Sequence, residues 1–334
     1  MDAVTDKLDG RWGIKDYIGT VMCLLGIRRK FYKQNPGLYS IGNPDSKSPV
    51  FVTANYKYSA DVLRRALKNT DAWILVIDTK GINVWCAAGK GTFGTAEIIS
   101  RVNKTGLKDT VSHRTLILPQ LGAPGVKPAE VRKNTGFSVK YGPVEADDIP
   151  QFIKNGFTAD RKMRTKQFRI PERLAVSLTH MVQGLLPTAA IALFFVLVDF
   201  LFSLKGNSGV TGFLSINISA SLGALLGGTL IAGALLPLLP GRAFSIKGFF
   251  ISILFALFFF QKISSYSSPL FTLYTGGKIL ILAGWIVYLV LNLTGSSTYT
   301  SLSGVKKETA ISLPLVAAGS FAGLAMIITG GILL

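Results

Sequence analysis

The sequence has few of the residues that build metal clusters and disulfide frameworks. It contains two cysteines and two histidines in 334 residues. An iron–sulfur cluster takes about four thiolates, and a disulfide framework needs several cysteine pairs, so neither is expected in this chain. His113 and His180 are too far apart for the spacing of zinc ligands. The first fifteen residues also lack the apolar stretch of a signal peptide, so we expect the polar part of the chain to stay in the cytoplasm.

Charge is also scarce, and it is unevenly placed. Charged residues make up 16% of the chain, whereas an ordinary soluble domain has about 25%. Residues 1–173 hold 29 of the 36 lysines and arginines and 16 of the 18 acidic residues. A basic polar half is therefore followed by an apolar half, which excludes a fully soluble protein.

The apolar half is predicted to cross a membrane several times. A helix needs about 20 apolar residues to span the hydrocarbon core. Five segments are candidates, at residues 174–204, 218–239, 244–261, 277–293 and 311–334. We therefore expect an all-α transmembrane domain over residues 174–334 with about five helices. Asp199 and His180 lie toward the ends of the first segment, which favours the membrane interface for both.

A basic juxtamembrane linker over residues 161–173 sets the expected orientation. Positive residues favour the cytoplasmic side, and a cluster directly before a span meets anionic lipid rather than nucleic acid. Five spans then place the C-terminus outside, in a multi-pass protein of the cytoplasmic membrane. Basic residues in the expected inward connections are Arg242, Lys247, Lys306 and Lys307, and those in the outward ones are Lys205, Lys262 and Lys278.

The polar half alternates between strand and helix patterns. Strands are predicted over residues 50–55, 72–78, 114–119 and 137–141, and helices over 59–69, 95–103, 128–133 and 148–155. Repeated β–α units imply a parallel sheet with helices on both faces, an α/β Rossmann-like domain over residues 50–160. Residues 1–49 are expected to pack on it. Ligands of such sheets bind beyond the carboxyl ends of the strands, here near residues 53–56, 78–86, 120–124 and 142–146.

The segment after the second predicted strand allows three interpretations. Residues 89–94 match the dinucleotide pattern G-x-G-x-x-G, but ten residues separate them from Asp78, whereas that pattern directly follows its strand. A phosphate-binding loop fails at Val84 and Gly91. The third interpretation is a short helix capped by Asn83, with Cys86 in its first turn, where a thiolate is favoured. A buried packing cysteine is the alternative for Cys86, and it is the expectation for Cys23.

Residues 83–90 (NVWCAAGK) resemble the signature of the mercury-methylation corrinoid proteins. The resemblance continues through residues 36–39, 52–56, 118–125 and 141–143, and it includes the order of a soluble part followed by a membrane part. The soluble half is also similar to the cobalamin domain of the corrinoid iron–sulfur protein of acetyl-CoA synthesis, without the cluster domain of that protein. The resemblance implies an α/β Rossmann-like corrinoid-binding domain followed by a transmembrane bundle.

The same resemblance implies a cofactor and a reaction. The cofactor is cobalamin or a related corrinoid, bound base-off, with the Cys86 thiolate as the lower axial ligand of cobalt. A methyl group passes from a methyl-tetrahydrofolate-type donor to Co(I), and from methyl-Co(III) to Hg(II), formally as a carbanion, to give methylmercury. The expected corrinoid-binding residues are Thr53, Asn83, Val84, Trp85, Cys86, Ala87, Lys90, Gln120, Leu121 and Ala146.

The expected partner is a small ferredoxin with two 4Fe-4S clusters, because this chain has no redox centre besides cobalt to supply electrons. No nucleic-acid partner is expected. Two alternatives stay open. One is a membrane-bound corrinoid methyl carrier whose natural acceptor is not mercury. The other is a nucleotide-binding regulator of a transport bundle.

Overall fold

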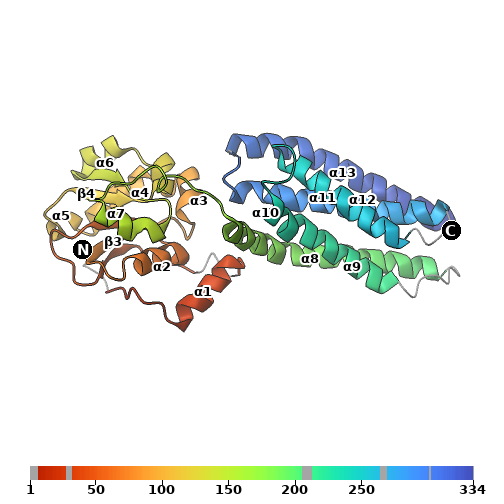
Figure 1. Ribbon diagram of the computed structural model, residues 1–334, viewed down its shortest axis with the longest axis horizontal. Helices are drawn as coiled ribbons and strands as arrows, with labels where there is room; N and C mark the ends of the chain where they lie inside the picture. Colours follow the sequence, from red (N-terminus) through yellow and green to blue (C-terminus); the bar gives the residue numbers. More distant parts are fainter. Residues whose placement is uncertain (1–6, 28–31, 205–212, 264–268, 301, 334) are drawn as a thin grey trace. The chain divides into compact units, whose positions relative to one another are not determined.

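The chain folds into two compact units. The computed structural model describes residues 7–27, 32–204, 213–263, 269–300 and 302–333. The first unit comprises Met1–Cys23 and Ile27–Gln167, and the second comprises Leu24–Gly26 and Phe168–Leu334. A sheet covered by helices forms the first unit, and the second is helical (Figure 1).

The first unit is built on a five-stranded sheet of order β1-β3-β2-β4-β5. The strands are β1 (Gly37–Ile41), β2 (Val50–Ala54), β3 (Ala72–Ile77), β4 (Thr115–Leu118) and β5 (Ser138–Tyr141). The four predicted strands are confirmed, and they pair in parallel, with Ala54 opposite Ile77. The prediction of an all-parallel sheet is wrong at one edge, because β1 pairs antiparallel with β3. No crossover helix separates β1 from β2, and a parallel return needs one.

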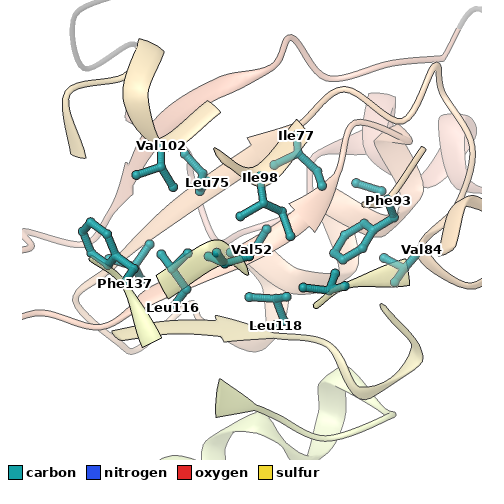
Figure 2. Close-up of a cluster of buried hydrophobic side chains, with 14 of the residues drawn as sticks. Val52, Leu75, Ile77, Val84, Phe93, Ile98, Val102, Leu116, Leu118 and Phe137 are labelled. Carbon is teal, nitrogen blue, oxygen red and sulfur yellow. The ribbon is translucent and has the colours of Figure 1, made fainter. Parts of the chain in front are cut away.

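Helices cover both faces of this sheet, as the α/β pattern predicts. One face carries α3 (Val84–Gly89), α4 (Thr95–Lys104) and α6 (Pro128–Thr135), which bury alternate strand residues such as Val52 and Leu116 (Figure 2). The other face carries α2 (Lys57–Ala66) and α7 (Ile149–Lys154), which pack on Phe51 and Ile117. Because strand side chains alternate between faces, Thr53 belongs to the face of Phe51. Shorter elements are α5 (Leu107–Thr110), η1 (Gln120–Gly125) and η2 (Ala146–Asp148).

The second unit is a helical bundle. Its helices are α8 (Ile170–Ser203), α9 (Phe213–Leu226), a π-helical turn (Gly227–Ile231), α10 (Ala232–Leu235), α11 (Phe244–Ile263), α12 (Pro269–Asn292) and α13 (Leu302–Leu333), with a 3-10 turn at Thr294–Ser296. Among the described residues, four helices are long and apolar enough to cross a membrane: Ile170–Ser203, Leu214–Leu235, Pro269–Ser296 and Ser303–Leu333. The third expected span, residues 244–261, corresponds to α11, which has 20 residues and whose apolar run is described over Phe244–Phe259.

A buried polar cluster joins three of these helices. Asp199 of α8 is 4% exposed, and its carboxylate accepts hydrogen bonds from Lys278 Nζ of α12 at 2.5 Å, from Asn217 Nδ2 of α9 at 2.5 Å and from the Tyr274 hydroxyl. The sequence placed Lys278 in an outward connection. That placement is wrong, because α12 begins at Pro269 and Lys278 is buried inside the helix. Lys205, Leu334 and the side chain of Lys262 lie outside the described residues.

Loss of one charge from the ion pair between Asp199 and Lys278 is expected to weaken the bundle. Lys278→Met leaves the Asp199 carboxylate buried with no counter-charge, which costs about 3 kcal/mol of unfolding free energy. We expect a clear fall in the midpoint of thermal unfolding in detergent. The double variant Asp199→Asn/Lys278→Met removes both charges and is expected to recover much of the loss. Lys306→Met, at an exposed lysine of α13, is the matched control. An unchanged midpoint for Lys278→Met would show that the pair contributes no stability.

Candidate functional site

The loop between β3 and α3 is held by one buried amide side chain, that of Asn55. Asn55 directly follows β2 and is 3% exposed. Its Oδ1 accepts the N–H of Thr79 at 3.0 Å and that of Gly81 at 2.9 Å, and its Nδ2 donates to Asp78 Oδ1 at 3.0 Å. The Thr79 hydroxyl lies 2.9 Å from Asn55 Oδ1 and 2.6 Å from the Ile82 carbonyl, and it can donate to either. Asn55 therefore fixes the path of the chain toward α3.

The short helix that carries Cys86 begins where the sequence predicted. Asn83 has extended backbone angles, and its Oδ1 accepts the N–H of Cys86 at 2.9 Å, as an N-cap does. The first turn holds Cys86, whose side chain is half-buried, while Val84 and Ala87 are buried beneath the helix. Trp85 is half-buried, and Lys90 is exposed and forms the C-cap. The cap therefore fixes the Cys86 backbone and leaves its thiol partly open to solvent.

The packing of α3 against η1 depends on glycine. A Cβ atom on Gly125 would lie 2.2 Å from the Phe93 carbonyl oxygen and 3.1 Å from Ala88 Cα. One on Gly122 would lie 2.5 Å from the Phe93 ring, which is fully buried. Only glycine at both positions lets the segment after β4 approach the segment after β3 so closely. These contacts bring η1, which begins at Gln120, close to α3, which carries Cys86, at the carboxyl edge of the sheet.

Open space and an unpaired acceptor lie on this side of the domain. A Cβ atom on Gly89 or Gly91 would meet no atom within 4 Å. The Oε1 atom of Gln120 is buried and has no hydrogen-bond partner. A buried acceptor without a partner is costly, so a ligand that donates a hydrogen bond there would stabilise the site. Burial also raises the pKa of the Tyr141 phenol at the end of β5, which keeps that group neutral and able to donate.

The structure brings some of the expected binding residues together and separates others. Val84, Ala87 and Leu121 share the core of one face of the sheet. Ala146 packs with the core of the other face, to which Thr53 also belongs. These residues line one edge of the sheet without forming one contiguous cluster, so a ligand that contacts all of them must be broad.

The local fold also tests the expectations for the glycine pattern at residues 89–94 and for Cys23. The glycine pattern at residues 89–94 does not directly follow a strand, because α3 lies between β3 and the pattern, and Gly94 is the N-cap of α4. This arrangement does not fit a dinucleotide fingerprint. Cys23 is 3% exposed within the core of the first unit, as expected for a packing cysteine.

Asn55, which holds the loop between β3 and α3, was not among the site residues expected from the sequence. Asn55 lies within the motif at residues 52–56, at the carboxyl end of a strand, but no spacing rule marks its role. The signal available was a polar amide directly after a buried strand, at the edge where ligands of parallel sheets bind. Its partners follow the neighbouring strand, so the parallel register of β2 and β3 brings them together.

The first unit is similar in sequence to parts of known proteins. A family described as the CO dehydrogenase/acetyl-CoA synthase delta subunit matches residues 15–153. The acetyl-CoA decarbonylase/synthase complex subunit gamma of Methanopyrus kandleri is 30% identical over 145 residues, which are 43% of this chain and 31% of that protein. The same subunit of Methanocaldococcus jannaschii is 30% identical over 148 residues, 44% of this chain and 30% of that protein.

These matches define how far the similarity extends. The chain spans less than a third of the length of these curated relatives. The family match ends at residue 153, before the helices of the second unit begin at Ile170. It includes β1 to β5, α3 and η1, and therefore the whole carboxyl edge described above. Residues 15–153 are thus similar to part of the subunits of CO dehydrogenase/acetyl-CoA synthase complexes, in line with the resemblance of the soluble half to a protein of acetyl-CoA synthesis.

Proposed function

We propose that this chain is a membrane-anchored corrinoid protein that transfers a methyl group to Hg(II), formally as a carbanion, to give methylmercury. The observation that carries the proposal is the signature at residues 83–90. It folds as a capped helix with a half-exposed cysteine, at the ligand edge of a domain similar to the corrinoid iron–sulfur protein. The similarity supports a corrinoid domain, and the signature supports mercury as the acceptor.

The residues at this edge suit a corrinoid. Such a cofactor, when bound, supplies a cobalt centre that accepts and releases a methyl group. Cys86 would supply a soft thiolate donor to that metal, and the Asn83 cap holds its backbone in place. Gln120 Oε1 provides the unpaired acceptor that a peripheral corrin amide would satisfy. Ala87 and Ala88 are buried, so open space for a flat ring lies instead beside Gly89 and Gly91, where a Cβ atom would meet no atom within 4 Å.

Thiolate ligation explains the direction of transfer. Hg(II) is an electrophile, so the methyl group must leave with the bonding electron pair. By donating electron density, the Cys86 thiolate would make the metal of a bound corrinoid better able to release the methyl group in this way. We propose Thr53, Val84, Trp85, Lys90, Leu121 and Ala146 as further contacts of the corrinoid, at the strand ends and on α3.

Two partners complete the proposed cycle. A methyl-tetrahydrofolate-type donor, or its methyltransferase, supplies the methyl group. A small ferredoxin with two 4Fe-4S clusters supplies electrons, because two cysteines in this chain are too few for an iron–sulfur cluster, which takes about four thiolates. The second unit would anchor this chemistry at the cytoplasmic membrane, with the corrinoid domain inside and the C-terminus outside.

The proposal is tested by the spectrum and the product of the purified protein. We expect visible absorbance typical of a corrinoid, and methylmercury when the methyl-loaded protein is mixed with Hg(II) under reducing, oxygen-free conditions. A corrinoid spectrum without methylmercury would favour the second candidate, a methyl carrier with a different acceptor, which the similarity to acetyl-CoA decarbonylase/synthase subunits supports. No visible absorbance after reconstitution with cobalamin would exclude both functions.

A further inference from the structure

The first unit carries an apolar stripe on one helix, α1 (Ile14–Leu24). Ile14, Tyr17, Ile18 and Val21 are 79, 57, 58 and 52% exposed. Their spacing of three and four residues places them along one face of the helix. Among the described residues of the first unit, the exposed large hydrophobic side chains are these four and Ile27. Apolar exposure concentrated in this way marks an interaction surface.

The opposite face of α1 is fixed to the first unit, so the stripe stays turned outward. Gly19 and Cys23 are buried, and a Cβ atom on Gly19 would overlap the Tyr32 ring. The Asp16 carboxylate pairs with Arg64 at 2.6 Å and with Lys57 at 3.4 Å. These contacts hold the helix from one side and leave its apolar stripe unused.

Two exposed basic side chains lie near the stripe. Arg11 precedes the helix, Lys15 lies in its first turn, and both side chains are exposed. Asp16 is the acidic residue of the helix, and its charge is balanced by Arg64 and Lys57. Lysine and arginine beside an apolar stripe are typical of helices that lie on anionic membranes.

The last residue of α1, Leu24, belongs to the compact unit that holds the candidate membrane-spanning helices. Leu24–Gly26, where the helix ends, belong to the second unit. Within that unit, the Thr179 hydroxyl donates to the Leu24 carbonyl. Thr179 lies in the first third of α8, which is long and apolar enough to cross a membrane.

We propose that α1 lies in the surface of the bilayer, with its apolar stripe in the interfacial region of an anionic leaflet. An amphipathic helix in this position buries its apolar face about 5–10 Å deep, at the boundary of head groups and acyl chains. Tyr17 suits that boundary because its ring is apolar and its hydroxyl is polar. Lys15 and Arg11 reach the lipid phosphates from the edge of the stripe.

Hydrogen–deuterium exchange of the full chain in lipid nanodiscs tests this proposal. Backbone amides of residues 14–24 are expected to exchange at least about tenfold more slowly on discs with anionic lipid than on zwitterionic discs, because each basic side chain gains binding energy near an anionic surface. Ile18→Asp/Val21→Asp should abolish the slowing. Ala96→Asp/Ala129→Asp adds the same charge at exposed positions of α4 and α6 and should retain it.

A second variant separates lipid binding from misfolding of the helix. Arg11→Gln/Lys15→Gln leaves both faces of α1 intact, and it should reduce the difference between anionic and zwitterionic discs while α2 exchanges as before. Equal slowing on both discs and in amphipol would mean that the protein itself, or a second copy of it, covers the stripe. That result would overturn the proposal, and so would fast exchange in all three environments.

Discussion

Cys86→Ala is expected to abolish methyl transfer to Hg(II) while leaving the domain folded. The side chain is half-buried on α3, and the capping bond from its backbone N–H to Asn83 Oδ1 is retained when the side chain is shortened. Alanine is also a better helix former than cysteine. The expected loss is more than about a hundredfold, since removing even an outer group around a metal ligand costs up to that much.

The cobalt spectrum separates a lost ligand from a lost fold. With Cys86→Ala we expect corrinoid to remain bound through its peripheral contacts, with a shifted visible spectrum because the thiolate no longer binds the metal. Cys23→Ala is the matched control, since the other cysteine is buried in the core of the first unit. It should change neither spectrum nor activity. Full activity and an unchanged spectrum for Cys86→Ala would contradict the proposed ligand.

The elements set by local sequence were predictable. The strands β2 and β3 are continuous apolar runs, and every residue of both is buried. The start of α3 followed from Asn83 alone, because an N-cap acts on the next turn of its own helix. By contrast, β1 was not predicted, and it is a strand because it pairs with β3, some 35 positions later in the chain. A partner at that distance leaves no local pattern.

The misplacement of Lys278 in the second unit has the same origin. Nothing near Lys278 in the sequence marks a partner for its charge, so it was placed in an outward connection at the start of the fourth expected span. In the fold its partner Asp199 is 79 positions away, and the ion pair lets a longer α12 bury both charges.

Asn55→Ala is expected to destabilise the first unit and displace the corrinoid. The variant leaves the N–H groups of Thr79 and Gly81 buried without their acceptor, and it removes the donor to Asp78. Each unsatisfied buried group costs about 1–3 kcal/mol, so the unfolding free energy should fall by about 4 kcal/mol. Because the loop leads directly into α3, we also expect weaker corrinoid binding, measured by its release from the purified protein.

The exchange of two side chains tests whether Asn55 acts through this loop. Asn55→Asp keeps the acceptor for Thr79 and Gly81 but places a carboxylate beside that of Asp78, so like charges repel and stability falls. Adding Asp78→Asn supplies an amide donor from the other side, and the pair regains its hydrogen bond. The double variant should therefore be more stable than Asn55→Asp alone and bind corrinoid more tightly. If the two substitutions simply add, the contact between Asn55 and Asp78 contributes nothing to the site, and the loop must be positioned by other contacts.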